Sequence, residues 1–247
     1  MKPAIDVADL KVNYGQTTIL DGVTMQVAPG DVAIVLGGSG CGKSTLLKTI
    51  IGLVEPVAGK VSLFGELRSP GQEEGPPRSL KRVGVMFQYG ALFNSITVGE
   101  NVALPLEMHT DLGDGLIEEV VRTRLHLVGL DHAYALFPNE LSGGMRKRAA
   151  LARAMALDPE ILFCDEPGAG LDPLTAAEID HLLLTLNGSL GTTLVIVTHE
   201  LLSIERMNGK LIMLDAGRVV FTGSVAEAKI SDLPAVSRFF HAGDTHS

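Results

Sequence analysis

The amino-acid sequence predicts an α/β protein built around a largely parallel sheet. Two observations carry this prediction. Short aliphatic runs of strand length, such as residues 194–197, alternate along the chain with segments of helical apolar period. A glycine-rich turn also joins the strand predicted at residues 31–36 to a helix. The chain has 247 residues, which is long enough for one core domain with an inserted subdomain.

The first part of the chain contains mainly predicted strands. Residues 5–27 alternate apolar and polar side chains and predict two strands with a turn near Asn13. A helix is expected after residue 43, with apolar positions at helical spacing, and Gly52 ends it. Further strands are predicted at residues 31–36, 60–64 and 83–87, with an exposed loop at residues 66–79.

From about residue 90 to 156 the apolar period becomes helical, and at least three helices are expected. Strands at 161–164 and 193–197 then flank a helix, and a hairpin near Asp215 and two short helices follow. We therefore predict a single domain with three parts. They are a core with an N-terminal β subdomain (1–88 and 157–228), a helical subdomain (89–156) and a helical tail (229–247).

Composition excludes several classes of function. The net charge of −9 repels a polyphosphate backbone, so nucleic acid is not expected as a partner. The two cysteines lie far apart, which argues against a disulfide framework or a cysteine metal cluster and fits a reducing compartment. We expect no signal peptide, and no apolar run approaches the roughly 20 residues that span a bilayer. Membrane association is therefore expected through partner chains only.

The glycine-rich turn fits the phosphate-binding pattern called the P-loop. Glycines allow successive backbone N–H groups to converge on phosphate oxygens, and the following helix directs its positive end at the same anion. Lys43 is expected to reach the terminal phosphates and Ser44 to ligate Mg²⁺. The predicted ATP-binding residues of this segment are Gly37, Gly38, Ser39, Gly40, Cys41, Gly42, Lys43, Ser44 and Thr45.

Two carboxylates follow the strand predicted at residues 161–164. Asp165 and Glu166 would lie at the carboxyl edge of a parallel sheet, where ligands bind. We expect Asp165 to hold Mg²⁺, directly or through water, and Glu166 to act as general base toward the attacking water. The alternative is that the pair caps a helix.

A second glycine-rich turn lies at Leu141-Ser142-Gly143-Gly144-Met145. Ser142 is a good N-cap, which is one explanation for the segment. Capping does not explain two glycines in a first helical turn, where they lower helix stability. We interpret the glycines as allowing backbone to approach a second anion closely.

These motifs resemble those of the ATP-binding-cassette (ABC) ATPases over nearly the whole chain. The resemblance implies a P-loop NTPase (RecA-like) core, and a head-to-tail homodimer in which the P-loop of one subunit and Ser142, Gly143 and Gly144 of the other enclose ATP. It also implies roles at four further positions. Tyr14 matches the aromatic that stacks on adenine, Gln88 the glutamine that senses Mg²⁺ and water, Asp172 the loop between the two sites, and His199 the histidine that contacts the γ-phosphate.

Two groups of residues near these motifs have competing explanations. Cys41 lies near a helix N-terminus, which would lower its thiol pKa, but a small filler residue is the explanation we prefer. The basic residues that follow Met145 could form an anion patch, and a solvated helix face is the explanation we prefer. They are Arg146, Lys147, Arg148 and Arg153.

Within the ABC family, a separate chain without spanning segments favours the ATPase subunit of a bacterial transporter. Residues 87–106 and 141–156 resemble the cassette of the Mla/MCE phospholipid transport systems. That implies a permease, an MCE lipid-binding protein, a small accessory subunit, and a position on the cytoplasmic face of the inner membrane. Gly168 departs from the serine usual there. The alternatives are another ABC importer or exporter, for example of amino acids, and a soluble chromosome, repair, translation or iron–sulfur assembly ATPase.

Overall fold

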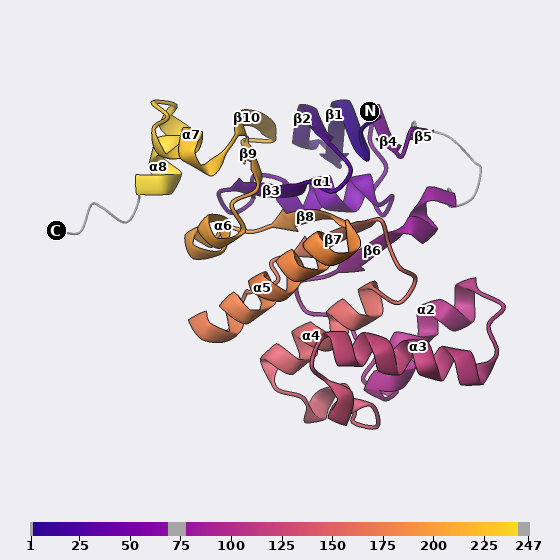
Figure 1. Ribbon diagram of the computed structural model, residues 1–247. Coiled ribbons are helices and arrows are strands. Elements are labelled where there is room, and N and C mark those ends of the chain that lie inside the picture. Colours follow the sequence, from indigo (N-terminus) through magenta and orange to yellow (C-terminus); the bar gives the residue numbers. More distant parts are fainter. Residues whose placement is uncertain (1, 69–77, 242–247) are drawn as a thin grey trace.

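The computed structural model describes residues 2–68 and 78–241 and contains two sheets with helices packed around them (Figure 1). The first sheet is antiparallel, with strand order β2-β1-β4-β5. Its strands are β1 (Ile5–Tyr14), β2 (Thr17–Val27), β4 (Ala58–Leu63) and β5 (Glu66–Arg68). The loop predicted at 66–79 is therefore wrong for Glu66–Arg68, which pairs with β4, and residues 69–77 lie outside the described chain.

The second sheet has six strands in the order β10-β9-β3-β8-β7-β6. They are β3 (Val32–Gly37), β6 (Val83–Met86), β7 (Ile161–Asp165), β8 (Thr193–Val197), β9 (Lys210–Asp215) and β10 (Arg218–Gly223). Five of them run parallel, and only β10 pairs antiparallel, with β9. The predicted α/β class with a parallel sheet is confirmed.

Helices lie on the parallel sheet and follow its strands. They are α1 (Lys43–Ile50), α5 (Pro173–Leu190), α6 (Leu201–Met207), α7 (Val225–Lys229) and α8 (Pro234–His241), with a short 3-10 turn η1 (Arg78–Arg82) before β6. The sequence patterns indicated all of these except η1 and α6. Helix α6 follows β8 directly and positions the segment around residue 199.

Three α-helices fall between β6 and β7 and gather at one end of the molecule (Figure 1). They are α2 (Val98–His109), α3 (Asp114–Leu127) and α4 (Gly143–Ala154), joined through 3-10 turns η2 (Asp131–Ala133) and η3 (Pro138–Glu140). Thr97 and Glu100 form a capping box that fixes the start of α2. The boundary of a helical subdomain at 89–156 stays a prediction.

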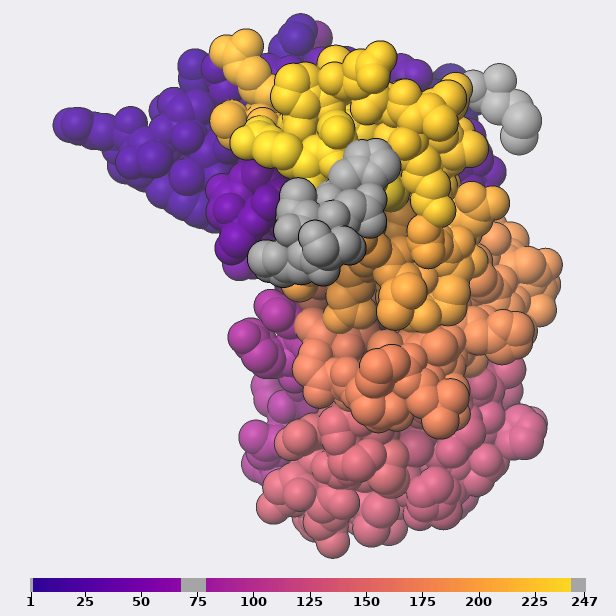
Figure 2. All heavy atoms as spheres, turned by 90° about the vertical axis from the view of Figure 1, so that its left-hand side faces the viewer, coloured from indigo at the N-terminus to yellow at the C-terminus, as the bar shows by residue number. Residues whose placement is uncertain are grey.

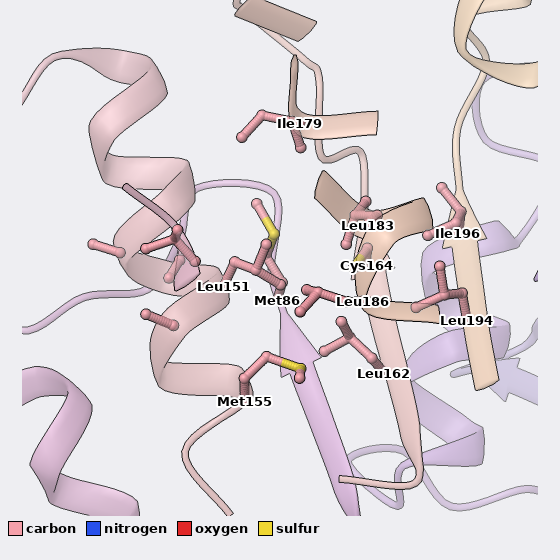
Figure 3. Packing of buried hydrophobic residues seen from close by; sticks show 14 of the residues in the cluster. Met86, Leu151, Met155, Leu162, Cys164, Ile179, Leu183, Leu186, Leu194 and Ile196 are labelled. Atoms are coloured by element: carbon pink, nitrogen blue, oxygen red, sulfur yellow. The ribbon is translucent and has the colours of Figure 1, made fainter. Parts of the chain in front are cut away.

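Alternation along the parallel strands divides the core into two clusters. Leu162 and Ile196 face α4 and α5 and pack with Leu151 and Leu183 (Figure 3). The intervening residues of the same strands, such as Phe163, face α1 and the antiparallel sheet. Each fully buried aliphatic side chain contributes about 1.5–3 kcal/mol, so both faces of the sheet are fixed and its carboxyl edge is a rigid platform.

Within the described residues, no helix is both long and apolar enough to cross a membrane.

Candidate functional site

A cavity of about 1040 Å³ opens at the carboxyl edge of the parallel sheet. Segments distant in sequence meet there, because the parallel strands end at the same edge. Tyr14 comes from the end of β1, Gln88 follows β6, Glu166 follows β7 and His199 follows β8. The P-loop supplies the floor with Gly37, Gly38, Ser39, Gly40, Gly42, Lys43, Ser44 and Thr45. The structure thus brings most of the predicted site into one cavity.

Two P-loop glycines are required by the backbone. A Cβ on Gly37 would lie 2.2 Å from the carbonyl oxygen of Leu214, and Gly42 has a φ of 107° as the N-cap of α1. Lys43 Nζ donates to the carbonyls of Gly37 and Gly38, both at 2.9 Å. Its ammonium therefore lies at the loop that leads into the N-terminus of α1, and both the charge and the helix N-terminus favour an anion there.

Oxygen ligands suited to Mg²⁺ meet between the P-loop and β7. Ser44 Oγ lies 3.4 Å from Asp165 Oδ1, although the two residues are far apart in sequence. Asp165 is 7% exposed, and burial followed by the charge of Glu166 raises the pKa of its carboxyl. No cluster of three metal-binding side chains occurs in the described chain.

Glu166 is held from several directions. Its backbone has a φ of 50°, which is unusual for a side chain other than glycine, and its N–H donates to the carbonyl of Val197 at 2.8 Å. Its Oε1 lies 2.7 Å from Nδ1 of His199, and Oε2 accepts from Thr198 Oγ1 at 3.4 Å. The residue as a whole is 8% exposed. Helix capping does not explain Asp165 and Glu166, because Asp172 is the N-cap of α5.

The second glycine-rich turn lies outside this cavity. Ser142 is the N-cap of α4 and accepts from Met145 N–H at 3.2 Å. A Cβ on Gly144 would lie 2.6 Å from Cγ2 of Thr175, so packing against the start of α5 already requires this glycine. Asp172 also lies outside, and the hydroxyl of Thr175 lowers the pKa of its carboxyl. Within one chain, Ser142, Gly143, Gly144 and Asp172 do not line the P-loop cavity.

This geometry agrees with the comparison to known proteins. Residues 20–169, more than half of the chain, match the ABC transporter family. The chain belongs to the ABC transporter family. As an ABC cassette it binds and hydrolyses ATP, and it is the ATP-binding subunit of a transporter. The predicted fold and the family resemblance are thereby confirmed.

Named relatives cover nearly the whole cassette. The intermembrane phospholipid transport system ATP-binding protein MlaF of Escherichia coli K12 is 36% identical, over 98% of this chain and 95% of the relative. A probable ribonucleotide transport ATP-binding protein, mkl, of Mycobacterium leprae is 39% identical, over 98% of this chain and 70% of the relative. The cassette MJ0796, solved as a dimer bound to ADP and Pi, superposes with a TM-score of 0.82 at 28% identity, over 90% of this chain and 98% of that structure.

Within this ABC cassette, the expectation of a lowered Cys41 pKa is wrong. The side chain is 8% exposed, and burial raises the pKa of its thiol more than the nearby Lys43 ammonium lowers it. Cys41 does not line the cavity, and its Sγ lies beneath the loop, where a Cβ on Gly37 would approach it to 2.8 Å. A small buried filler is the explanation that the structure supports.

The interpretation of the basic residues after Met145 as a solvated helix face is also wrong, except for Arg146. Lys147 is 7% exposed and donates to the carbonyls of Gln88 and Glu166. Arg153 donates to the carbonyls of Gly90 and Ala91, and Arg148 donates to that of Val128 and to Glu178. The missed signal is spacing, because Lys147 precedes buried Ala150 and Leu151 by three and four residues.

The contribution of the C-terminal helix α8 to the P-loop cavity is a second feature that sequence patterns missed, although they predicted the helix itself. Ala235, Arg238 and Phe239 of α8 line the P-loop cavity, together with Asp215 from β9. In the rotated space-filling view the C-terminal segment, in yellow, covers one end of the molecule beside the N-terminal strands, in indigo (Figure 2). No sequence motif predicts this contribution of α8, because that side of the cavity forms only when the C-terminal segment packs against the core.

Proposed function

We propose that this ABC subunit drives phospholipid transport between the inner and outer membranes of a bacterium. The observation that carries the catalytic part is the single cavity that joins Tyr14, the P-loop, Gln88, Glu166 and His199. The cargo is supported by the match of nearly the whole chain to a phospholipid transport cassette. The subunit would act on the cytoplasmic face of the inner membrane, with a permease, an MCE lipid-binding protein and a small accessory subunit.

The residues of the cavity divide into binding and catalytic roles. Lys43 and the P-loop N–H groups would hold the phosphates, and Tyr14 would stack on adenine. Ser44, Asp165 and Gln88 would hold Mg²⁺, which would stabilise charge on the phosphate oxygens. Glu166 would accept the proton of the attacking water at its carboxylate, while His199 orients that carboxylate and contacts the γ-phosphate.

A second copy of the chain would complete the site. Ser142, Gly143 and Gly144 lie outside the cavity of their own chain, at an exposed helix N-terminus suited to an anion. In a head-to-tail dimer they would meet the γ-phosphate bound to the partner, and Asp172 would lie near the contact between the two sites. The dimeric solved relative supports this arrangement.

The permease would dock beside the loop that follows β6. Tyr89 is 90% exposed and Phe93 is also exposed, immediately after Gln88 and before α2. Aromatic side chains that extend into solvent are typical anchors of an interface. Closure of the dimer would therefore be transmitted from Gln88 to residues 89–101 and on to the permease.

Glu166→Gln tests the catalytic part. The variant should bind ATP with a dissociation constant within about twofold of the parent and lose turnover by roughly 10³-fold, because the amide does not accept the proton of water. Binding is measured by isothermal titration and turnover by phosphate release. Hydrolysis at the parent rate would exclude Glu166 as the base.

The cargo needs a separate experiment, because one relative is named for phospholipid and another for ribonucleotide transport. The complex should be purified with its membrane partners, and its bound small molecules identified by mass spectrometry. Phospholipid bound in stoichiometric amount supports the proposal. A ribonucleotide or amino acid bound to a receptor subunit of the same complex would replace phospholipid as the cargo.

A further inference from the structure

Lys147 is a buried cation for which the chemistry above has no role. It lies in the second turn of α4, with 7% of its surface exposed. Its Nζ donates to two main-chain carbonyls, that of Gln88 and that of Glu166, the second at 2.9 Å. Burying an ammonium is unfavourable, and here burial lowers the pKa of Lys147. An apolar side chain would fill the same space without that penalty, so the ammonium calls for a specific reason.

The two carbonyls belong to two of the residues that are proposed to act on ATP. Gln88 follows β6 and Glu166 follows β7, neighbouring strands of the sheet, and both residues line the nucleotide cavity. Lys147 itself does not line that cavity. From outside the cavity, the Lys147 ammonium therefore fixes the backbones of Gln88 and Glu166 relative to each other.

The bond to Glu166 acts on a strained peptide. With a φ of 50°, Glu166 adopts a left-handed conformation that a side chain of this kind rarely takes. The conformation is held on one side by the Glu166 N–H, which donates to the Val197 carbonyl at 2.8 Å. It is held on the other side by Lys147, which binds the Glu166 carbonyl. The same carbonyl also accepts from Ala169 N–H at 3.2 Å, so without the ammonium the Glu166 backbone loses one of three hydrogen bonds, the one that comes from a side chain. The carboxylate keeps its contacts with His199 and Thr198, but the backbone that carries it is less firmly fixed.

We propose that Lys147 is a positioning residue that aims the Glu166 carboxylate and the Gln88 side chain at bound ATP. The inference rests on the proposed role of Glu166 as base. Lys147 lies in α4, five residues after the N-cap Ser142. About 7.5 Å of rigid helix therefore connects Lys147, which binds the backbone of Glu166, to the turn that is proposed to contact the nucleotide of the partner subunit. Lys147 would thereby link dimer closure to the placement of Glu166.

Arg153 provides a matched control from the same helix. It is a partly buried cation on α4, and it also binds two main-chain carbonyls, those of Gly90 and Ala91. It makes no hydrogen bond to Glu166 among the described residues. If buried cations on α4 matter only for folding, replacing Lys147 or Arg153 should have the same consequences.

The test compares Lys147→Met, Lys147→Arg and Arg153→Met in the full chain, with ATP affinity, kcat, KM and the midpoint of thermal unfolding measured for each. Lys147→Met should keep ATP affinity and KM within about twofold and lower kcat by roughly tenfold or more. Lys147→Arg, which retains the donors, should recover at least about a third of kcat. Arg153→Met should lower the unfolding midpoint comparably and keep kcat within about threefold.

Equal losses of kcat in Lys147→Met and Arg153→Met, at equal losses of stability, would overturn the proposal. If Lys147→Met does not fold, Lys147→Gln takes its place in the test. The glutamine amide retains a hydrogen-bond donor but not the full reach of the lysine side chain. Parent-like kcat in a folded Lys147→Gln would also overturn the proposal. Glu166→Gln separates the two proposals. If that variant keeps turnover, the role of Glu166 fails, and if it is inactive while Lys147→Met is normal, only the positioning role of Lys147 fails.

Discussion

The P-loop and the turn at residues 141–145 have similar sequences but different physical roles. Both are glycine-rich turns that lead into a helix. In the P-loop, Gly37 and Gly42 have positive φ and line a cavity together with groups from several other strands and the loops that follow them. In the second turn, Gly143 and Gly144 are helical, lie outside that cavity, and Gly144 packs against Thr175. One turn lines a cavity built within the chain, and the other lies outside it, where we propose that a second copy of the chain completes the site.

The comparison predicts different defects for the two turns, and the P-loop defect should be the larger. Lys43→Met removes the ammonium that lies over the loop, so ATP affinity should fall by roughly 100-fold and turnover should be lost with it. Isothermal titration with ATP measures the first and phosphate release the second. Thr45→Ser, which changes the same helix turn without removing a charge, is the control and should bind ATP normally. Parent-like affinity in Lys43→Met would contradict the assigned role.

Ser142→Arg should lower turnover by about 100-fold or more, while the affinity of the single chain for ATP stays within about twofold of the parent value. The reason is that a bulky side chain at the N-cap of α4 blocks the approach of the partner's nucleotide, and leaves the cavity of its own chain untouched. Titration with ATP at low protein concentration separates binding from turnover. A loss of affinity equal to the loss of turnover would place Ser142 in its own chain's site.

Mixing two inactive variants gives a sharper form of this test. In a mixed dimer of Glu166→Gln and Ser142→Arg, one composite site has an intact Glu166 and an intact Ser142. Turnover should reappear on mixing, up to roughly a quarter of the parent rate. Each variant alone is the control. If both residues served the same site within one chain, the mixture would stay inactive.

The two glycines of the second turn should differ from each other. Gly144→Ala places a methyl group 2.6 Å from Thr175 Cγ2, and Thr175 does not turn freely because its hydroxyl bonds to Asp172. We expect a loss of about 1–3 kcal/mol in the free energy of unfolding, measured with urea. Gly143→Ala meets Leu171 only at 3.4 Å and should leave stability unchanged or slightly raised. Equal effects of the two substitutions would remove packing as the reason for Gly144.

The sequence predicted the fold class and the family of this chain better than the packing that surrounds its motifs. The parallel sheet and the P-loop follow from local patterns, namely aliphatic strands, glycines and a helix start. The burial of Lys147 and the contribution of Arg238 to the cavity wall do not follow from local patterns, because both depend on how distant segments of the chain pack together. The same holds for Cys41, whose thiol pKa depends on burial in the folded core more than on its place before a helix. Local motifs predict candidate reacting groups, and tertiary packing determines which contacts hold these groups in place.

The smallest effect concerns two aspartates, one on each side of the comparison. Burial raises the pKa of Asp165, so its ionised form destabilises the folded chain at neutral pH and the penalty disappears as pH falls toward about 4. Asp165→Asn should therefore raise the unfolding midpoint by a few degrees at pH 7 without nucleotide, and the gain should shrink on acidification. The hydroxyl of Thr175 lowers the pKa of Asp172, so the sign reverses. Asp172→Asn should lower the midpoint at pH 7, with the difference fading as pH falls through the folded-state pKa. Thermal scans at pH 7 and pH 4.5 measure the first variant, and scans extended to about pH 3 measure the second, because the contribution of Asp172 fades only below the ordinary aspartate pKa of about 4. A lowered midpoint of Asp165→Asn at pH 7 would mean that the carboxylate beside the P-loop bears no burial penalty.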